Sequence, residues 1–141
     1  MQTRAEILQD FLRGRNCAQC TLAHYAEAQD FEVEESDRYA ACFGGGLESG
    51  GPCGAVIGAL MGIGLSVEDP GERHRINLEF QRRFTERNGS LLCKELLGYD
   101  MSQPGQHEAA MASGRIAEVC PDLVLSAVEI LDELLEEEEE A

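Results

Sequence analysis

The chain has 141 residues, the size of one ordinary domain, and its hydrophobic fraction of 43% is typical of a globular protein. Its 11 Lys and Arg against 27 Asp and Glu give a net charge of −16, which disfavours nucleic acid and anionic membranes as partners. Six cysteines without an amino-terminal signal peptide indicate a reducing, cytoplasmic location, where metal binding or redox chemistry is commoner than structural disulfides.

Three helices are predicted in the first part of the chain. A capping box that begins at Thr3 predicts an amphipathic helix over residues 3–13. Asn16 is a suitable N-cap for a second helix. Ser36 is expected to begin a third helix, which would include Cys42.

A glycine-rich segment, residues 44–51, follows and predicts a loop, because glycine loses much backbone entropy on ordering. Pro52 fits the first turn of the next helix, which is predicted over residues 52–65. Glycines recur every four residues within it and predict a smooth stripe on which another backbone packs closely: Gly54, Gly58 and Gly62.

A charged helix is predicted to open at Asp69 and Pro70 and to end at Gly89. Ser90 then begins a short helix that carries Cys93 in its first turn. The side chains expected to face the core from the charged helix are apolar: Ile76, Leu78, Phe80 and Phe84.

The carboxyl-terminal part is predicted to be weakly helical over residues 106–118, and Cys120 and Pro121 then open a last amphipathic helix. The run of like charges near the end is expected to fray, which gives an acidic tail, 136–141, after a domain over residues 1–135. No strand is predicted. The fold class is therefore all-α: a compact single-domain bundle of about six to seven helices with a glycine-rich loop.

Membrane insertion is not expected. The longest apolar stretch, residues 55–65, is about half of what a transmembrane helix needs, and glycines interrupt it. The composition is compatible with a monomer or an oligomer.

Four cysteines are predicted to lie at or next to helix N-termini: Cys17, Cys53, Cys93 and Cys120. The helix dipole and free N–H groups stabilise a thiolate there, and thiolates are both the nucleophiles and the metal ligands. The alternative is that each cysteine is a small buried core residue. By contrast, no carboxylate pair suggests acid–base catalysis, and His24, His74 and His107 receive no catalytic role, so the sequence does not decide whether the protein is an enzyme.

The same cysteines carry a resemblance to a known family. Its marks are Cys17, Phe43-Gly44-Gly45-Gly46, the stretch from Cys53-Gly54-Ala55 to Met61, the stretch from Cys93 to Gly98, and Cys120. Over roughly residues 12–130 the chain resembles the C_GCAxxG_C_C-type family of small redox-active proteins, which is defined by four cysteines and a Cys-Gly-Ala-x-x-Gly motif. It is also similar to a domain of split-Soret cytochromes that is associated with an iron–sulfur cluster.

The resemblance implies that Cys17, Cys53, Cys93 and Cys120 are the redox residues or the ligands of a cluster. Cys20 and Cys42 are additional to the family pattern. Each of these two is open to three interpretations: a spare thiol, a replacement ligand or a disulfide partner.

Three functions are compatible with these features. The first is an iron–sulfur protein that passes electrons to a protein redox partner, since four thiolates favour soft ions. The second is a metal-free thiol–disulfide redox protein. The third is a non-redox helical adaptor whose cysteines are structural or bind zinc.

Overall fold

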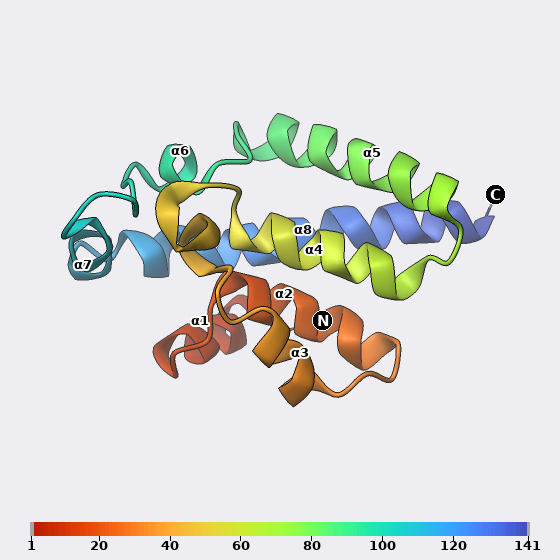
Figure 1. Ribbon diagram of the computed structural model, residues 1–141, viewed down its shortest axis with the longest axis horizontal. Helices are drawn as coiled ribbons and strands as arrows, with labels where there is room; N and C mark the ends of the chain where they lie inside the picture. Colours follow the sequence, from red (N-terminus) through yellow and green to blue (C-terminus); the bar gives the residue numbers. More distant parts are fainter. Residues whose placement is uncertain (1, 141) are drawn as a thin grey trace.

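Helix α4 (Gly54–Ser66) lies in the middle of the fold and packs against α2, α5 and α8 (Figure 1). The structure is a computed structural model that describes residues 2–140; Met1 and Ala141, which belong to the two ends of the predicted domain and tail, lie outside the described residues. The other elements are α1 (Arg4–Leu12), α2 (Cys17–Ala28), α3 (Val33–Tyr39), η1 (Gly46–Gly50), α5 (Pro70–Asn88), α6 (Cys93–Leu97), α7 (Gln106–Ala112) and α8 (Arg115–Glu140).

The all-α fold class is confirmed. Over residues 2–140 there is no strand, and β-type pairing is limited to one isolated bridge between Pro52 and Leu92. Residues 2–140 form eight α-helices instead of six to seven, because the weakly helical region forms the separate helix α7 before α8 begins. No helix in the described part of the chain is long and apolar enough to cross a membrane.

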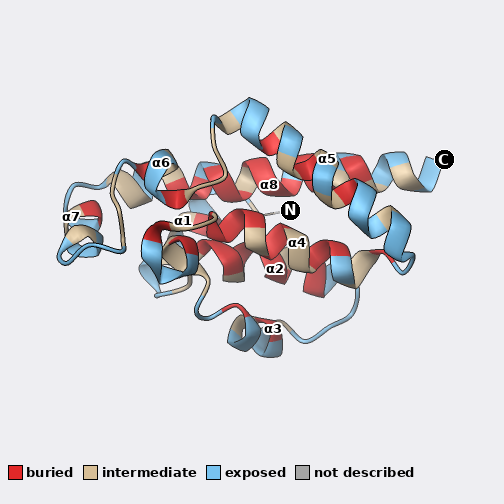
Figure 2. Ribbon diagram, turned by 45° about the horizontal axis from the view of Figure 1, so that its top comes forward, coloured by how far each residue is buried: buried red, intermediate tan, exposed pale blue. Residues whose placement is uncertain are grey.

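The largest cluster of buried residues comes mainly from α2, α4, α5 and α8, whose ribbons carry much of the red that marks burial in Figure 2. Helix α5 presents Ile76, Phe80 and Phe84 to this core, and all three are fully buried. Leu78, which was expected to point inward, is 53% exposed. That prediction was wrong because residues four apart share a helix face, whereas a residue two positions along lies on the opposite side.

The predicted glycine stripe is the contact surface between α4 and α2. A Cβ atom built on Gly58 would lie 2.7 Å from the Ala18 carbonyl oxygen, and one on Gly62 would lie 2.5 Å from the Tyr25 ring. Real side chains do not approach so closely, so only glycine permits this distance between the two helix backbones.

Helix starts follow the predicted caps at three places. Thr3 and Asn16 each form a capping box, and the Asp69 side chain accepts a hydrogen bond from the Glu72 N–H ahead of Pro70. The predicted start of α3 differs from the structure: Ser36 was expected to be its first residue, but it lies inside that helix. Its hydroxyl donates to the Val33 carbonyl, and α3 begins earlier because acidic residues in its first turn favour an N-terminus there.

Helix α8 also begins earlier than expected and passes through Pro121. A proline within a helix leaves the carbonyl four residues before it, here that of Ala117, without its usual N–H partner. The Arg4 guanidinium donates to this carbonyl at 3.3 Å and to that of Glu118 at 2.8 Å. Cys120 therefore lies inside a continuous helix, and its predicted place at a helix start was wrong.

The acidic end of the chain is helical as far as Glu140, and the predicted fraying of this end stays a prediction. Helix α5 supplies the opposite charges: Arg83 pairs with Glu137 at 3.1 Å and Arg75 with Glu138 at 3.1 Å. The expected boundary between domain and tail falls inside α8.

Replacing Gly58 by Ala is expected to lower the free energy of unfolding by about 1–3 kcal/mol, because the added methyl group overpacks the contact with Ala18. Gly64 lies on the same helix with nothing within 4 Å of the position of a Cβ, so Gly64→Ala is expected to stabilise by about 0.5–1 kcal/mol. Urea unfolding followed by circular dichroism measures both. Equal stability of the two variants would contradict the close packing.

Candidate functional site

Two cysteines are brought together by the bridge between Pro52 and Leu92. The Cys53 N–H donates to the Leu91 carbonyl at 2.7 Å, and the Cys93 N–H donates to the Gly51 carbonyl at 2.7 Å. In this antiparallel pairing the two cysteines are diagonal neighbours on one face, where such pairs lie roughly 7–8 Å apart. The bridge thus directs both side chains to the same side.

Cys17 reaches the same place from α2, of which it is the first residue. Its Sγ lies against Gly54, so close that a Cβ on Gly54 would clash with it. The Cys17 and Cys53 thiols are near enough for each to shift the pKa of the other. The first glycine of the α4 stripe therefore allows the contact between these two sulfur atoms.

Cys120 approaches from α8. It packs in one small apolar cluster with Cys93 and Leu97 of α6, against Ile116. Its place in the second turn of α8, and not at a helix start, is what directs it toward α6.

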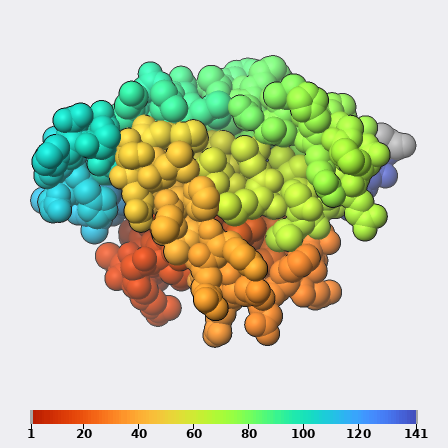
Figure 3. All heavy atoms as spheres, in the orientation of Figure 1, coloured from red at the N-terminus to blue at the C-terminus, as the bar shows by residue number. Residues whose placement is uncertain are grey.

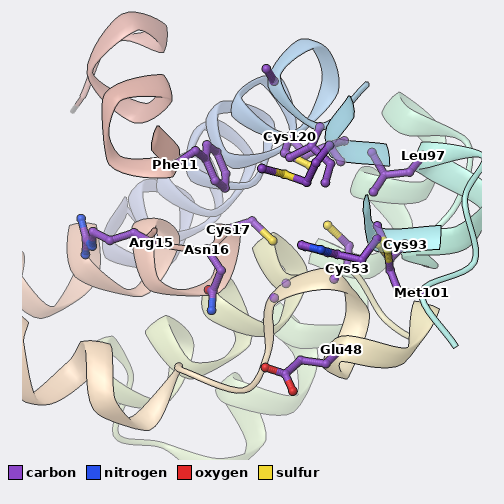
Figure 4. A pocket seen from close by; sticks show the side chains of 18 of the residues that line it. Phe11, Arg15, Asn16, Cys17, Glu48, Cys53, Cys93, Leu97, Met101 and Cys120 are labelled. Carbon is purple, nitrogen blue, oxygen red and sulfur yellow. The ribbon is translucent and has the colours of Figure 1, made fainter. Parts of the chain in front are cut away.

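All four cysteines line a single cavity of about 640 Å³ and are buried, with exposed fractions between 3% and 8% (Figure 4). Figure 4 shows them entering the cavity from different segments, with Phe11 of α1 beside them. The rest of the wall is mostly apolar: Leu8, Phe11, Leu12, Leu96, Leu97, Met101, Met111, Ile116 and Leu123 line it, with Arg15, Asn16, Glu48 and His107 as its polar side chains.

The glycine-rich segment, predicted as a loop, forms one wall of the cavity as a tight left-handed turn. Residues 45–48 all have φ near +60°, including the non-glycine residues Leu47 and Glu48. Gly46 is required here, since a Cβ would lie 2.7 Å from both the Gly51 nitrogen and the Cys93 Cβ. The turn also lies against Met101, and Figure 3 shows the yellow segment beside the teal one.

The four thiols differ in acidity. Hydrogen bonding from the Cys53 thiol lowers the pKa of Cys17, and the N–H groups of Gly45, Cys17 and Ala18 act in the same direction, against the effect of burial. The pKa of Cys53 is raised because it is the donor to Cys17 and is itself buried. Cys17 is therefore the thiol that ionises first within this pair.

Burial raises the pKa of Cys93 to about 12, and it raises that of Cys120 even more. The expectation that a helix N-terminus would make all four thiols acidic was thus wrong for three of them. For Cys93 and Cys120 burial is the main cause, and Cys120 is not at a helix start; for Cys53 the main cause is its interaction with Cys17, and burial adds to it.

The two additional cysteines lie outside the cavity wall. Cys20 is buried, and desolvation raises its pKa to about 12. Cys42 is exposed in the turn after α3. Neither lines the cavity with the four thiols, although Cys20 packs in the same core cluster as Cys17 and Cys53.

Glu48 and Met101, which the sequence did not single out, line the cavity, and so does His107, to which the sequence gave no catalytic role. No local pattern marks them, because their position depends on how the η1 turn and α7 fold over the site.

Within residues 2–140, no three His, Cys, Asp or Glu side chains gather closely enough to hold one metal ion. The four thiols are instead distributed around the cavity wall.

Comparison with known proteins gives one result. A family model described as "Putative redox-active protein (C_GCAxxG_C_C)" matches residues 15–134. No curated protein and no solved structure matches the chain. The similarity to split-Soret cytochromes stays a prediction.

Removing the Cys53 thiol is expected to raise the pKa of Cys17, because Cys17 loses the hydrogen bond that most stabilises its thiolate. The test is a pH titration of thiolate absorbance in reduced, metal-free protein that carries Cys42→Ser, so that no exposed thiol contributes. Cys53→Ala is compared with Cys93→Ala, which removes a thiol of the same cavity that donates no hydrogen bond to Cys17. An equal rise of the Cys17 pKa in the two variants, or no rise in Cys53→Ala, would refute the assignment of Cys53 as the group that lowers this pKa.

Proposed function

Because the chain belongs to the C_GCAxxG_C_C family of redox-active proteins, we propose that it is an electron-transfer protein whose cavity holds an iron–sulfur cluster. The observation that carries this proposal is the convergence of four cysteines, from four separate segments of the chain, on one cavity. The proposed ligands are Cys17, Cys53, Cys93 and Cys120.

The chemistry of the donor set fits such a cluster. Four thiols outnumber the one histidine and one carboxylate that also line the cavity, His107 and Glu48, and such a donor set favours soft metals. Cysteine thiolates are the usual ligands of iron–sulfur clusters. A cluster also spans more space than one ion, which suits thiols spread around a cavity wall. The raised pKa values of Cys53, Cys93 and Cys120 are compatible with this, since metal coordination deprotonates a thiol outright.

A bound cluster would supply one-electron transfer, and the surroundings of the thiols would tune its potential. The Gly45 N–H donates to the Cys17 sulfur, and hydrogen bonds to ligand sulfur atoms are one determinant of potential. The apolar wall limits access of water, which is another.

The acidic charge of the chain supports a basic protein as the redox partner. A net charge of −16 would steer a basic protein toward it, and electron transfer would then weaken at high salt. We propose that this electron transfer takes place in the cytoplasm, where thiols are kept reduced.

Protein purified without oxygen is expected to contain iron and acid-labile sulfide and to show the visible absorption of a cluster. Each of Cys17→Ser, Cys53→Ser, Cys93→Ser and Cys120→Ser is expected to lose most of its iron, because each removes one ligand. Cys42→Ser is the matched control and should keep it, since Cys42 is exposed and outside the cavity. Iron and sulfide absent from the parent protein would overturn the proposal, and zinc in their place would favour a structural metal.

A second function is favoured by one pair of neighbouring thiols, Cys17 and Cys53, of which Cys17 has its pKa lowered and Cys53 has its pKa raised. A dithiol with one acidic member is suited to thiol–disulfide exchange. The Cys17 thiolate would attack a disulfide of the substrate and release one substrate thiolate. Cys53 would then lose its proton and attack the Cys17 sulfur, which forms the Cys17–Cys53 disulfide and releases the second substrate thiol.

If exchange is the function, metal-free protein treated with glutathione disulfide forms a reversible disulfide between Cys17 and Cys53, detected by peptide mass mapping. Cys53→Ser should stop at a mixed disulfide on Cys17, because the second thiol is missing. Cys93→Ser should still form the internal disulfide. Random pairing, or modification of Cys42 alone, would eliminate this candidate.

A further inference from the structure

The cavity is larger and more apolar than its four thiols require. We propose that it also binds a small uncharged, apolar organic molecule, held against the wall formed by Leu8, Phe11, Leu12 and Met111. This inference concerns the apolar part of the wall and does not depend on whether a cluster is bound.

Size and wall chemistry support the proposal. The whole cavity, including the space between the four thiols, has a volume of about 640 Å³, within the range of roughly 300–1,000 Å³ that is usual for small-molecule sites. A thiol pair such as Cys17 and Cys53 needs no such space. The mostly apolar wall offers water few polar partners, so displacement of water by an apolar molecule is favourable.

The charges of the wall exclude an anionic occupant. Arg15 is the one arginine or lysine that lines the described cavity, and its guanidinium is already paired. It donates to Asp10 at 2.9 Å and to Asp37 at 2.6 Å. Glu48 adds negative charge to the wall, and the net charge of −16 repels anions further. An uncharged molecule needs no free guanidinium and is not repelled by the negative charges.

Exposed apolar side chains lie around the same cavity. Leu12 is 71% exposed and Met111 56% exposed, and both line it. Leu47, 44% exposed, is the neighbour of Glu48 on the η1 turn. These side chains come from α1, α7 and η1, and exposed apolar groups gathered around a cavity are typical of a ligand entrance.

Two related fluorescent probes test the inference on the full-length protein: phenyl-naphthylamine, which is uncharged, and anilinonaphthalene sulfonate, which adds one negative charge to the same rings. The uncharged probe is expected to bind saturably, one molecule per chain, and more tightly than the sulfonate.

The variants Leu12→Glu and Met111→Glu should each weaken binding of the uncharged probe roughly tenfold, because a carboxylate in the wall must keep its hydration. Leu78→Glu is the matched control, since it adds the same charge at a position that is 53% exposed and outside the cavity. All three positions are exposed, so the variants should fold.

Three results would overturn the inference: no saturable binding, equal binding by the cavity variants and Leu78→Glu, or preference for the sulfonate. Iron is measured on the same samples and tests the cluster separately. Probe binding without iron would leave this inference intact while the cluster proposal fails, and iron without probe binding would do the reverse.

Discussion

The close approach of α2 to α4 is the contact on which the site depends. Three glycines, one per turn of α4, let the α2 backbone lie directly on the helix. Gly54 is the member of this stripe that faces Cys17, and Cys53 directly precedes it in the chain. Any larger side chain there would move α2 outward and separate the two thiols. The packing of the core and the geometry of the sulfur pair therefore rest on the same residues.

The other two cysteines reach the cavity through polar backbone interactions. The bridge at Pro52 and Leu92 aligns Cys93 with Cys53. For Cys120, the contact is made by Arg4 of α1, which donates to two carbonyls that precede Pro121 in α8. These hydrogen bonds tie α1 to the turn of α8 that carries Cys120. These contacts join distant parts of the chain, so the four thiols meet only when the whole fold is formed.

Burial and hydrogen bonding then give the four thiols unequal roles. Cys17 receives a thiol donor and several backbone N–H groups, and it is the member whose pKa is lowered. Its neighbours are kept protonated by the same apolar wall that suits an uncharged molecule. A cluster would use all four as thiolates, whereas disulfide exchange would use the acidic member and its donor. The two proposed functions thus draw on different properties of one cavity.

Local patterns in the sequence determined much of this protein. The capping boxes at Thr3 and Asn16 and the glycine stripe of α4 depend on residues a few positions apart, and the structure confirms them. The family motif likewise identified the four cysteines that line the cavity. The tertiary structure decided what depends on distant partners. Arg4 donates to the Ala117 carbonyl that Pro121 leaves without its N–H partner, burial raises the pKa of Cys93 and Cys120, and the folded η1 turn and α7 enclose the cavity. The spacing of residues in the sequence does not predict these outcomes, because each depends on groups that meet only when the chain is folded.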